Sequence, residues 1–146
     1  MHMSDVISTL NGLIETCKDG QEGFKTAADA VTDPEVKRLF LSYAQQRAQC
    51  VSELQAEVRR LGGDPETAGS VAGSLHRGWM NLKSAVTGKN DESIIAAAET
   101  GEDTAKTSYE EALREPLPPD VAQLVQRQYA AIKEAHDRVR FLKRAA

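Results

Sequence analysis

Hydrophobic residues recur every three or four positions along four long stretches of the chain, which is the period of an amphipathic α-helix. The stretches cover residues of about 4–31, 34–61, 91–114 and 120–144. All five prolines lie between these stretches or in a first turn, where they do not interrupt a helix. No segment alternates apolar and polar residues in the manner of a β-strand. The pattern therefore predicts an all-α protein.

Polar, glycine and proline residues mark the expected helix ends. Ser4 is a suitable N-cap for the first helix, and Asp33 followed by Pro34 begins the second. Gly62 ends the second helix, and Asp120 is placed to cap the fourth. The links after the first and third helices are short, so we expect two antiparallel hairpins.

A longer link joins the two hairpins and has an apolar pattern of its own. Leu75, Trp79 and Leu82 follow a helical period, which predicts a short helix at about residues 70–87. Four long helices with one long crossover are typical of the ferritin-like four-helix bundle. We expect residues 1–146 to form a single domain of this kind.

Polar residues interrupt the apolar faces of three helices. They are Arg47 on the second helix, Glu102 on the third and His136 on the fourth, where Lys133 lies adjacent to the apolar face. A buried carboxylate without a partner costs several kcal/mol, so we expect Arg47 and Lys133 to pair with Glu102 in a polar cluster inside the bundle. One alternative is a metal or redox site. The other is that these side chains face solvent, which would follow if the sequence alignment of the two helix pairs is wrong.

Several short phrases of the sequence resemble a bacterial ferritin-like four-helix-bundle family, within the ferritin and rubrerythrin-like superfamily, whose molecular function is unknown. The phrases are Asp19-Gly20 through Gly23-Phe24, Glu53-Leu54-Gln55, Leu61-Gly62-Gly63 and Arg77-Gly78-Trp79-Met80-Asn81-Leu82. The resemblance covers nearly the whole chain and implies the same fold.

The superfamily resemblance also implies where a di-iron centre would lie. Its first and third helices each supply a Glu, and its second and fourth each supply Glu-x-x-His. These positions fall on Cys17, on Arg47 with Cys50, on Glu102, and on Lys133 with His136. Two cations in place of carboxylates would repel iron, so we expect a degraded site with no cofactor and no catalytic residue. The alternative is one zinc or iron ion held by Cys17, Cys50, Glu102 and His136.

Charge and composition exclude other classes of function. The 146 residues include 22 acidic and 18 basic side chains, for a net charge of −4, and no long basic run indicates a nucleic-acid partner. No apolar stretch approaches the roughly 18 residues of a membrane span, and the N-terminus lacks the features of a signal peptide. We therefore expect a cytoplasmic protein with reduced cysteines.

No phosphate loop, nucleophile elbow or metalloprotease motif occurs in the sequence. The best prediction is a non-catalytic bundle with a structural or protein-interaction role. It would pair with itself or with a partner protein through the crossover residues Leu75, Trp79 and Leu82. The alternative is a metal-binding oxidoreductase or storage protein. A third hypothesis is a thiol redox sensor that uses Cys17 and Cys50.

Overall fold

Five helices make up the part of the chain that the computed structural model describes, which is residues 2–67, 69, 78–88 and 90–145. They are α1 (Met3–Ala30), α2 (Pro34–Arg60), α3 (Leu82–Thr87), α4 (Asp91–Leu113) and α5 (Pro119–Ala145). The four long helices agree with the expected ranges to within two residues. No strand occurs among these residues, and the all-α prediction is confirmed.

One of the three expected N-caps is present, and a further cap is found on α4. Asp33 caps α2 by accepting hydrogen bonds from two first-turn amides at 2.9 and 3.5 Å, and Asn90 caps α4 at 3.2 Å. The predictions for the other two helices are wrong. α1 begins before Ser4 and has His2 at its N-cap position, without a capping side-chain hydrogen bond. Asp120 lies in the first turn of α5, where its charge favours the helix dipole.

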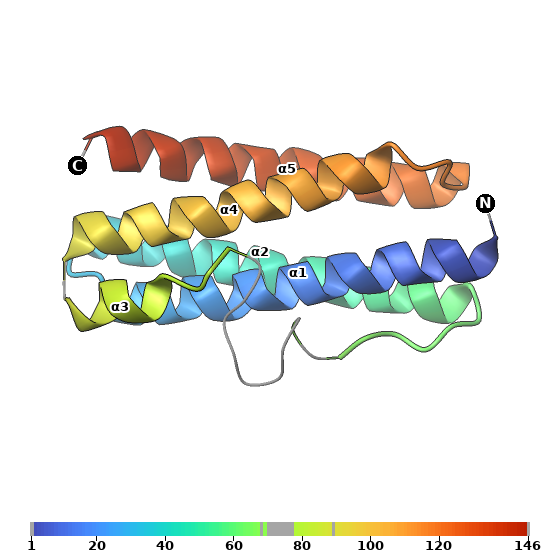
Figure 1. The fold of residues 1–146 in the computed structure, drawn as a ribbon, viewed down its shortest axis with the longest axis horizontal. Helices are drawn as coiled ribbons and strands as arrows, with labels where there is room; N and C mark the ends of the chain where they lie inside the picture. Colours follow the sequence, from blue (N-terminus) through green and yellow to red (C-terminus); the bar gives the residue numbers. More distant parts are fainter. Residues whose placement is uncertain (1, 68, 70–77, 89, 146) are drawn as a thin grey trace.

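The four long helices run along the same axis as two antiparallel hairpins, α1 with α2 and α4 with α5 (Figure 1). α2 ends at one end of the bundle and α4 begins at the other, so the chain between them crosses the whole length of the bundle. This crossover makes α2 parallel to α4, which is the connection expected of a ferritin-like bundle.

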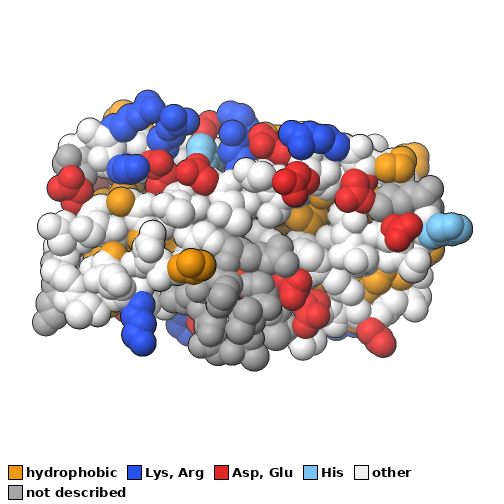
Figure 2. All heavy atoms as spheres, viewed as in Figure 1, with side chains coloured by type: hydrophobic (Ala, Val, Ile, Leu, Met, Phe, Trp, Pro, Cys, Tyr) orange, Lys and Arg blue, Asp and Glu red, His pale blue; other side chains and the backbone are white. Residues whose placement is uncertain are grey.

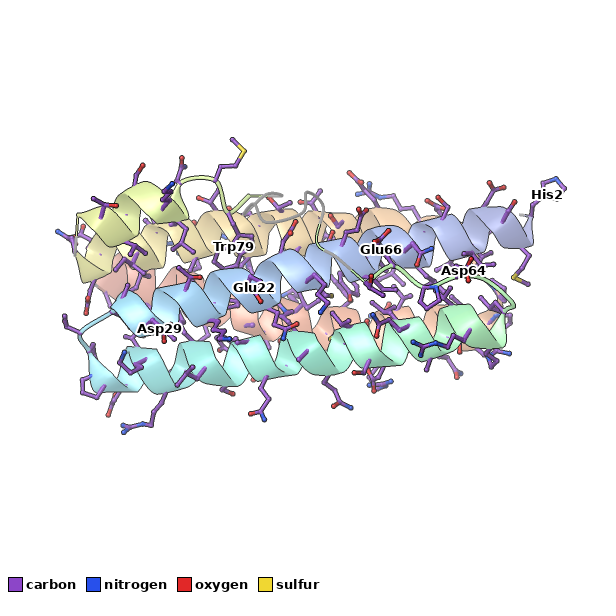
Figure 3. The ribbon with its side chains drawn as sticks, turned by 90° about the horizontal axis from the view of Figure 1, so that it is seen from below. His2, Glu22, Asp29, Asp64, Glu66 and Trp79 are labelled. Carbon is purple, nitrogen blue, oxygen red and sulfur yellow. The ribbon has the colours of Figure 1, made fainter. Side chains whose placement is uncertain are left out.

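The crossover ends in a segment that packs closely against the bundle. Trp79 is 1% exposed and lies between α1 and α4, where Gly23 and Gly101 leave room for its ring (Figure 3). Gly78 takes a φ of +92°, which a residue with a side chain rarely adopts. The helix after Trp79 covers six residues, Leu82–Thr87, and so begins later than the short helix expected at about 70–87, of which residues 70–77 lie outside the described part.

The bundle interior has two apolar halves with a polar layer between them. Leu10 and Leu54 belong to one half, and Phe24 and Phe40 belong to the other. Arg47 lies between these halves, at the same level as Glu102 on α4. This middle layer is where the sequence places the candidate site.

Candidate functional site

A buried ion pair occupies the middle layer of the bundle. Arg47 Nη1 lies 2.6 Å from Glu102 Oε1, and Nη2 donates to Oε2 at 2.6 Å, so the guanidinium and carboxylate meet through both pairs of atoms. Both side chains are 0% exposed. Burial alone would lower the pKa of Arg47, but the charge and hydrogen bonds of Glu102 raise this pKa above its usual value. Arg47 is therefore charged inside the bundle.

The backbone and an aromatic ring make room for the Arg47 side chain. A Cβ at Gly20 of α1 would lie 2.9 Å from Arg47 Nη1. Glycine at this position therefore leaves space for the guanidinium against the α1 backbone. The guanidinium carbon lies 5.4 Å from the centroid of the Phe24 ring, within cation–π range. Among the described residues, nothing accepts a hydrogen bond from Arg47 Nε. The site is thus shaped around a cationic side chain.

A second buried network lies beside the ion pair. Cys17 Sγ lies 3.1 Å from Tyr109 Oη, and Tyr109 donates to Gln128 Oε1 at 2.7 Å. Gln128 Nε2 donates to the Cys50 carbonyl at 3.3 Å and to Glu53 at 3.0 Å. The network links all four long helices. The periodic pattern of the sequence does not single out Tyr109 or Gln128, although polar atoms at buried positions need partners.

The two thiols of this network differ in their acidity. A hydrogen bond from Cys50 lowers the pKa of Cys17, and the charge of Arg47 acts in the same direction against the effect of burial. The same hydrogen bond and burial raise the pKa of Cys50. Burial and the neighbouring thiols also raise the pKa of Tyr109.

Lys133 and His136 pair with carboxylates other than Glu102, which corrects the prediction of one four-residue cluster. The Lys133 side chain is 50% exposed and pairs with Asp137 at 3.0 Å. The His136 ring is buried, but its nitrogens contact Asp103 at 2.5 Å and Asp137 at 3.0 Å. Lys133 follows the fully buried Ile132, and one residue along a helix turns a side chain by about 100°. Charged side chains of both signs mix along this α4–α5 edge (Figure 2).

The residues in the middle layer do not fit a di-iron centre. Such a centre needs about four carboxylates, whereas Glu102 has both oxygens against Arg47. Among the described residues, no group of three or more His, Cys, Asp or Glu side chains is arranged to hold a metal ion. Of the four candidate metal ligands, Cys17 and Cys50 are neighbours. The His136 ring instead contacts the carboxylates of Asp103 and Asp137.

The described part of the crossover does not provide the apolar surface that the sequence predicts. Trp79 and Leu82 are 1% and 0% exposed because they pack inside the bundle, and Leu75 lies outside the described residues. A different surface has exposed apolar groups, which we call the α2–α5 groove. It consists of two hollows of about 410 and 500 Å³ that share Leu39 and Arg138, and Phe141 at its edge is 64% exposed.

Comparison with known proteins identifies the family. A model of the family described as "Domain of unknown function (DUF2383)" matches residues 5–115. The chain belongs to the DUF2383 family. No curated protein gives a significant match. Within the described part of this DUF2383 chain, none of the helices is both long and apolar enough to cross a membrane.

Solved structures show the fold of this DUF2383 chain. A two-domain protein from Anabaena variabilis, with DJ-1/ThiJ/PfpI-like and ferritin-like domains, matches with a TM-score of 0.80 and 19% identity. The match covers 99% of this chain and 40% of that protein, so the chain spans less than half of its length. A point mutant of Dps1 from Mycobacterium smegmatis matches with a TM-score of 0.76 and 14% identity, over 97% and 96% of the two chains. The fold is ferritin-like, as the sequence predicts.

Proposed function

We propose that this chain is a ferritin-like bundle that acts without a di-iron centre and without catalysis, by binding protein through its surface. The observation that carries the proposal is the buried Arg47–Glu102 pair. The Arg47 guanidinium supplies the positive charge that metal ions would supply in a di-iron bundle, and the Glu102 carboxylate neutralises that charge. A cation added to this layer would have to displace Arg47, whose charge repels it.

The α2–α5 groove is the surface that supports a protein-binding role. It carries Arg38 and Arg138 together with Glu35, Glu134 and Asp137, beside the exposed ring of Phe141. In a two-fold dimer the same patch meets itself, so a patch with charges of both signs can satisfy its own charges. The partner in this proposal is therefore a second copy of the chain, joined through apolar contacts at Phe141 and complementary charges around it.

Sedimentation velocity over a range of protein concentrations tests this association. We expect the weight-average sedimentation coefficient to rise with concentration, and Phe141→Glu to abolish the rise because it places a charge against the apolar contact. Met80→Glu is the matched control, since Met80 is 68% exposed and lies outside the groove. A monomer at every concentration, or equal association of both variants, would contradict the proposed self-association.

One observation favours the alternative of a single-metal site. Cys17 and Cys50 are adjacent thiols, and the charge of Glu102 acts on Cys17. Thiolates are ligands that zinc prefers, and Co²⁺ serves as a visible substitute. Thiolate-to-Co²⁺ absorption that saturates at one ion per chain and disappears in Cys17→Ser would favour this alternative over the non-catalytic bundle.

A cytoplasmic location is part of the proposal. The sequence has two cysteines, too few for the disulfide framework typical of small secreted domains, which supports a reducing compartment.

A further inference from the structure

The two cysteines of the chain face each other across the α1–α2 hairpin. Both side chains belong to the same buried cluster, and the interaction between the two thiols lowers the pKa of Cys17 and raises the pKa of Cys50. The helix register agrees with this contact. Three residues after Cys17, Gly20 lies against Arg47, which is three residues before Cys50. The antiparallel packing of α1 and α2 therefore holds the two sulfur atoms opposite each other.

The surroundings of the two thiols restrict what each can react with. Cys17 is 1% exposed and Cys50 is 4% exposed, so a thiol on another protein cannot reach either sulfur while the bundle is folded. The sequence has only these two cysteines, so each has the other as its one thiol partner within the chain. Cys17 Sγ also contacts Tyr109 Oη at 3.1 Å, which orients this sulfur in the interior. Oxidation within the folded bundle is thereby directed to an intramolecular product.

We propose that Cys17 and Cys50 are a redox dithiol that a peroxide oxidises to a reversible disulfide, joining α1 to α2 at the middle of the bundle. One thiolate attacks a peroxide oxygen, so that an S–O bond forms, the O–O bond breaks and the leaving oxygen takes a proton as water or alcohol. The other sulfur then attacks the sulfenic acid, and the S–S bond forms as the S–O bond breaks and water leaves. Two thiols lose two electrons in total, and the peroxide gains them. This proposal is independent of the proposed protein-binding function.

Intact-mass spectrometry of the folded protein treated with hydrogen peroxide tests the proposal. We expect a loss of about 2 Da, restored by dithiothreitol, and a single cross-linked peptide containing residues 17 and 50 in a non-reducing digest. Cys17→Ser and Cys50→Ser are the matched controls, and neither should lose this mass. The oxidised wild type should unfold at a higher urea concentration than the reduced protein, since the cross-link restricts the unfolded chain.

Four results would overturn the proposal. The first is peroxide-treated protein whose two thiols are both alkylated once it is denatured. The second is a gain of oxygen at either cysteine without a cross-link, and the third is a disulfide between two chains. Far-ultraviolet circular dichroism before and after treatment establishes that the reaction occurs in folded protein. A cross-link that forms only in denaturant would likewise overturn it.

Discussion

Replacing Glu102 by leucine leaves the Arg47 charge buried without its partner. Both side chains are 0% exposed, and Arg47 has no other acidic partner within ion-pair distance among the described residues. Removing one member of a buried pair costs about 3–5 kcal/mol of the free energy of unfolding. A domain of this size has a free energy of unfolding of about 5–15 kcal/mol, so Glu102→Leu should lose a large share of it.

The same reasoning predicts a different result for the double variant. Replacing a buried pair by apolar residues of similar volume is often neutral or stabilising. Arg47→Met together with Glu102→Leu should therefore lie within about 1 kcal/mol of the native protein or above it. Lys133→Ala is the surface control, because its half-exposed pair with Asp137 contributes about 1 kcal/mol or less.

Urea unfolding provides the measurement. Circular dichroism follows the helices, and fluorescence follows Trp79, the single tryptophan, which lies in the core between α1 and α4. With a denaturant slope of about 2 kcal/mol per molar urea, Glu102→Leu should lower the midpoint by about 1.5–2.5 M. A single variant as stable as the native protein, or a double variant as unstable as the single one, would refute the reasoning.

Three further predictions follow from the packing and hydrogen bonds. Gly23→Ala should destabilise the protein by about 1–3 kcal/mol in the same urea assay, because the added Cβ would overlap the Trp79 ring. Gly12→Ala is the control: its Cβ would meet open space, so it should stabilise α1 by up to about 1 kcal/mol. Partial burial raises the pKa of Asp91, but hydrogen bonds from the α1–α2 loop at 2.8–3.0 Å outweigh this effect and hold the pKa below its usual value. The Asp91 carboxylate contributes its full stabilisation above about pH 3.9, and this contribution is lost as the pH falls through the lower pKa of the folded state. Asp91→Asn should therefore be less stable than the native protein at pH 7 and should lose less stability in acid. Equal acid dependence of the two proteins would contradict this. Tyr109→Phe leaves a buried glutamine oxygen without its donor and should lower thermal and urea stability by about 1–3 kcal/mol, and an unchanged midpoint would count against the network.

The sequence predicts the helices well because their determinants are local. Apolar periodicity and the prolines place the four long helices to within two residues. The caps are less well predicted, since Ser4 and Asp120 are each the second residue of their helix. The ferritin-like connection follows from link lengths alone, which explains why it agrees with the solved structures.

The candidate site is predicted only in part, because it depends on rotation about the helix axis and on contacts between distant residues. Arg47 and Glu102 lie on unambiguous apolar faces, and the ion pair expected between them is present. Lys133 lies one residue from its apolar face, which is enough to turn it to solvent. The burial of Trp79 requires Gly23 and another glycine on α4 to face the same point, and no local pattern reveals that.

Iron stoichiometry tests most directly the central claim that a protein cation occupies the place of the metals. Untagged protein is incubated with excess Fe²⁺ without oxygen, separated from free iron, and analysed by inductively coupled plasma mass spectrometry. We expect far less than one iron per chain, with no change in Glu102→Ala. Two irons per chain in the native protein, lost in Glu102→Ala, would contradict the account.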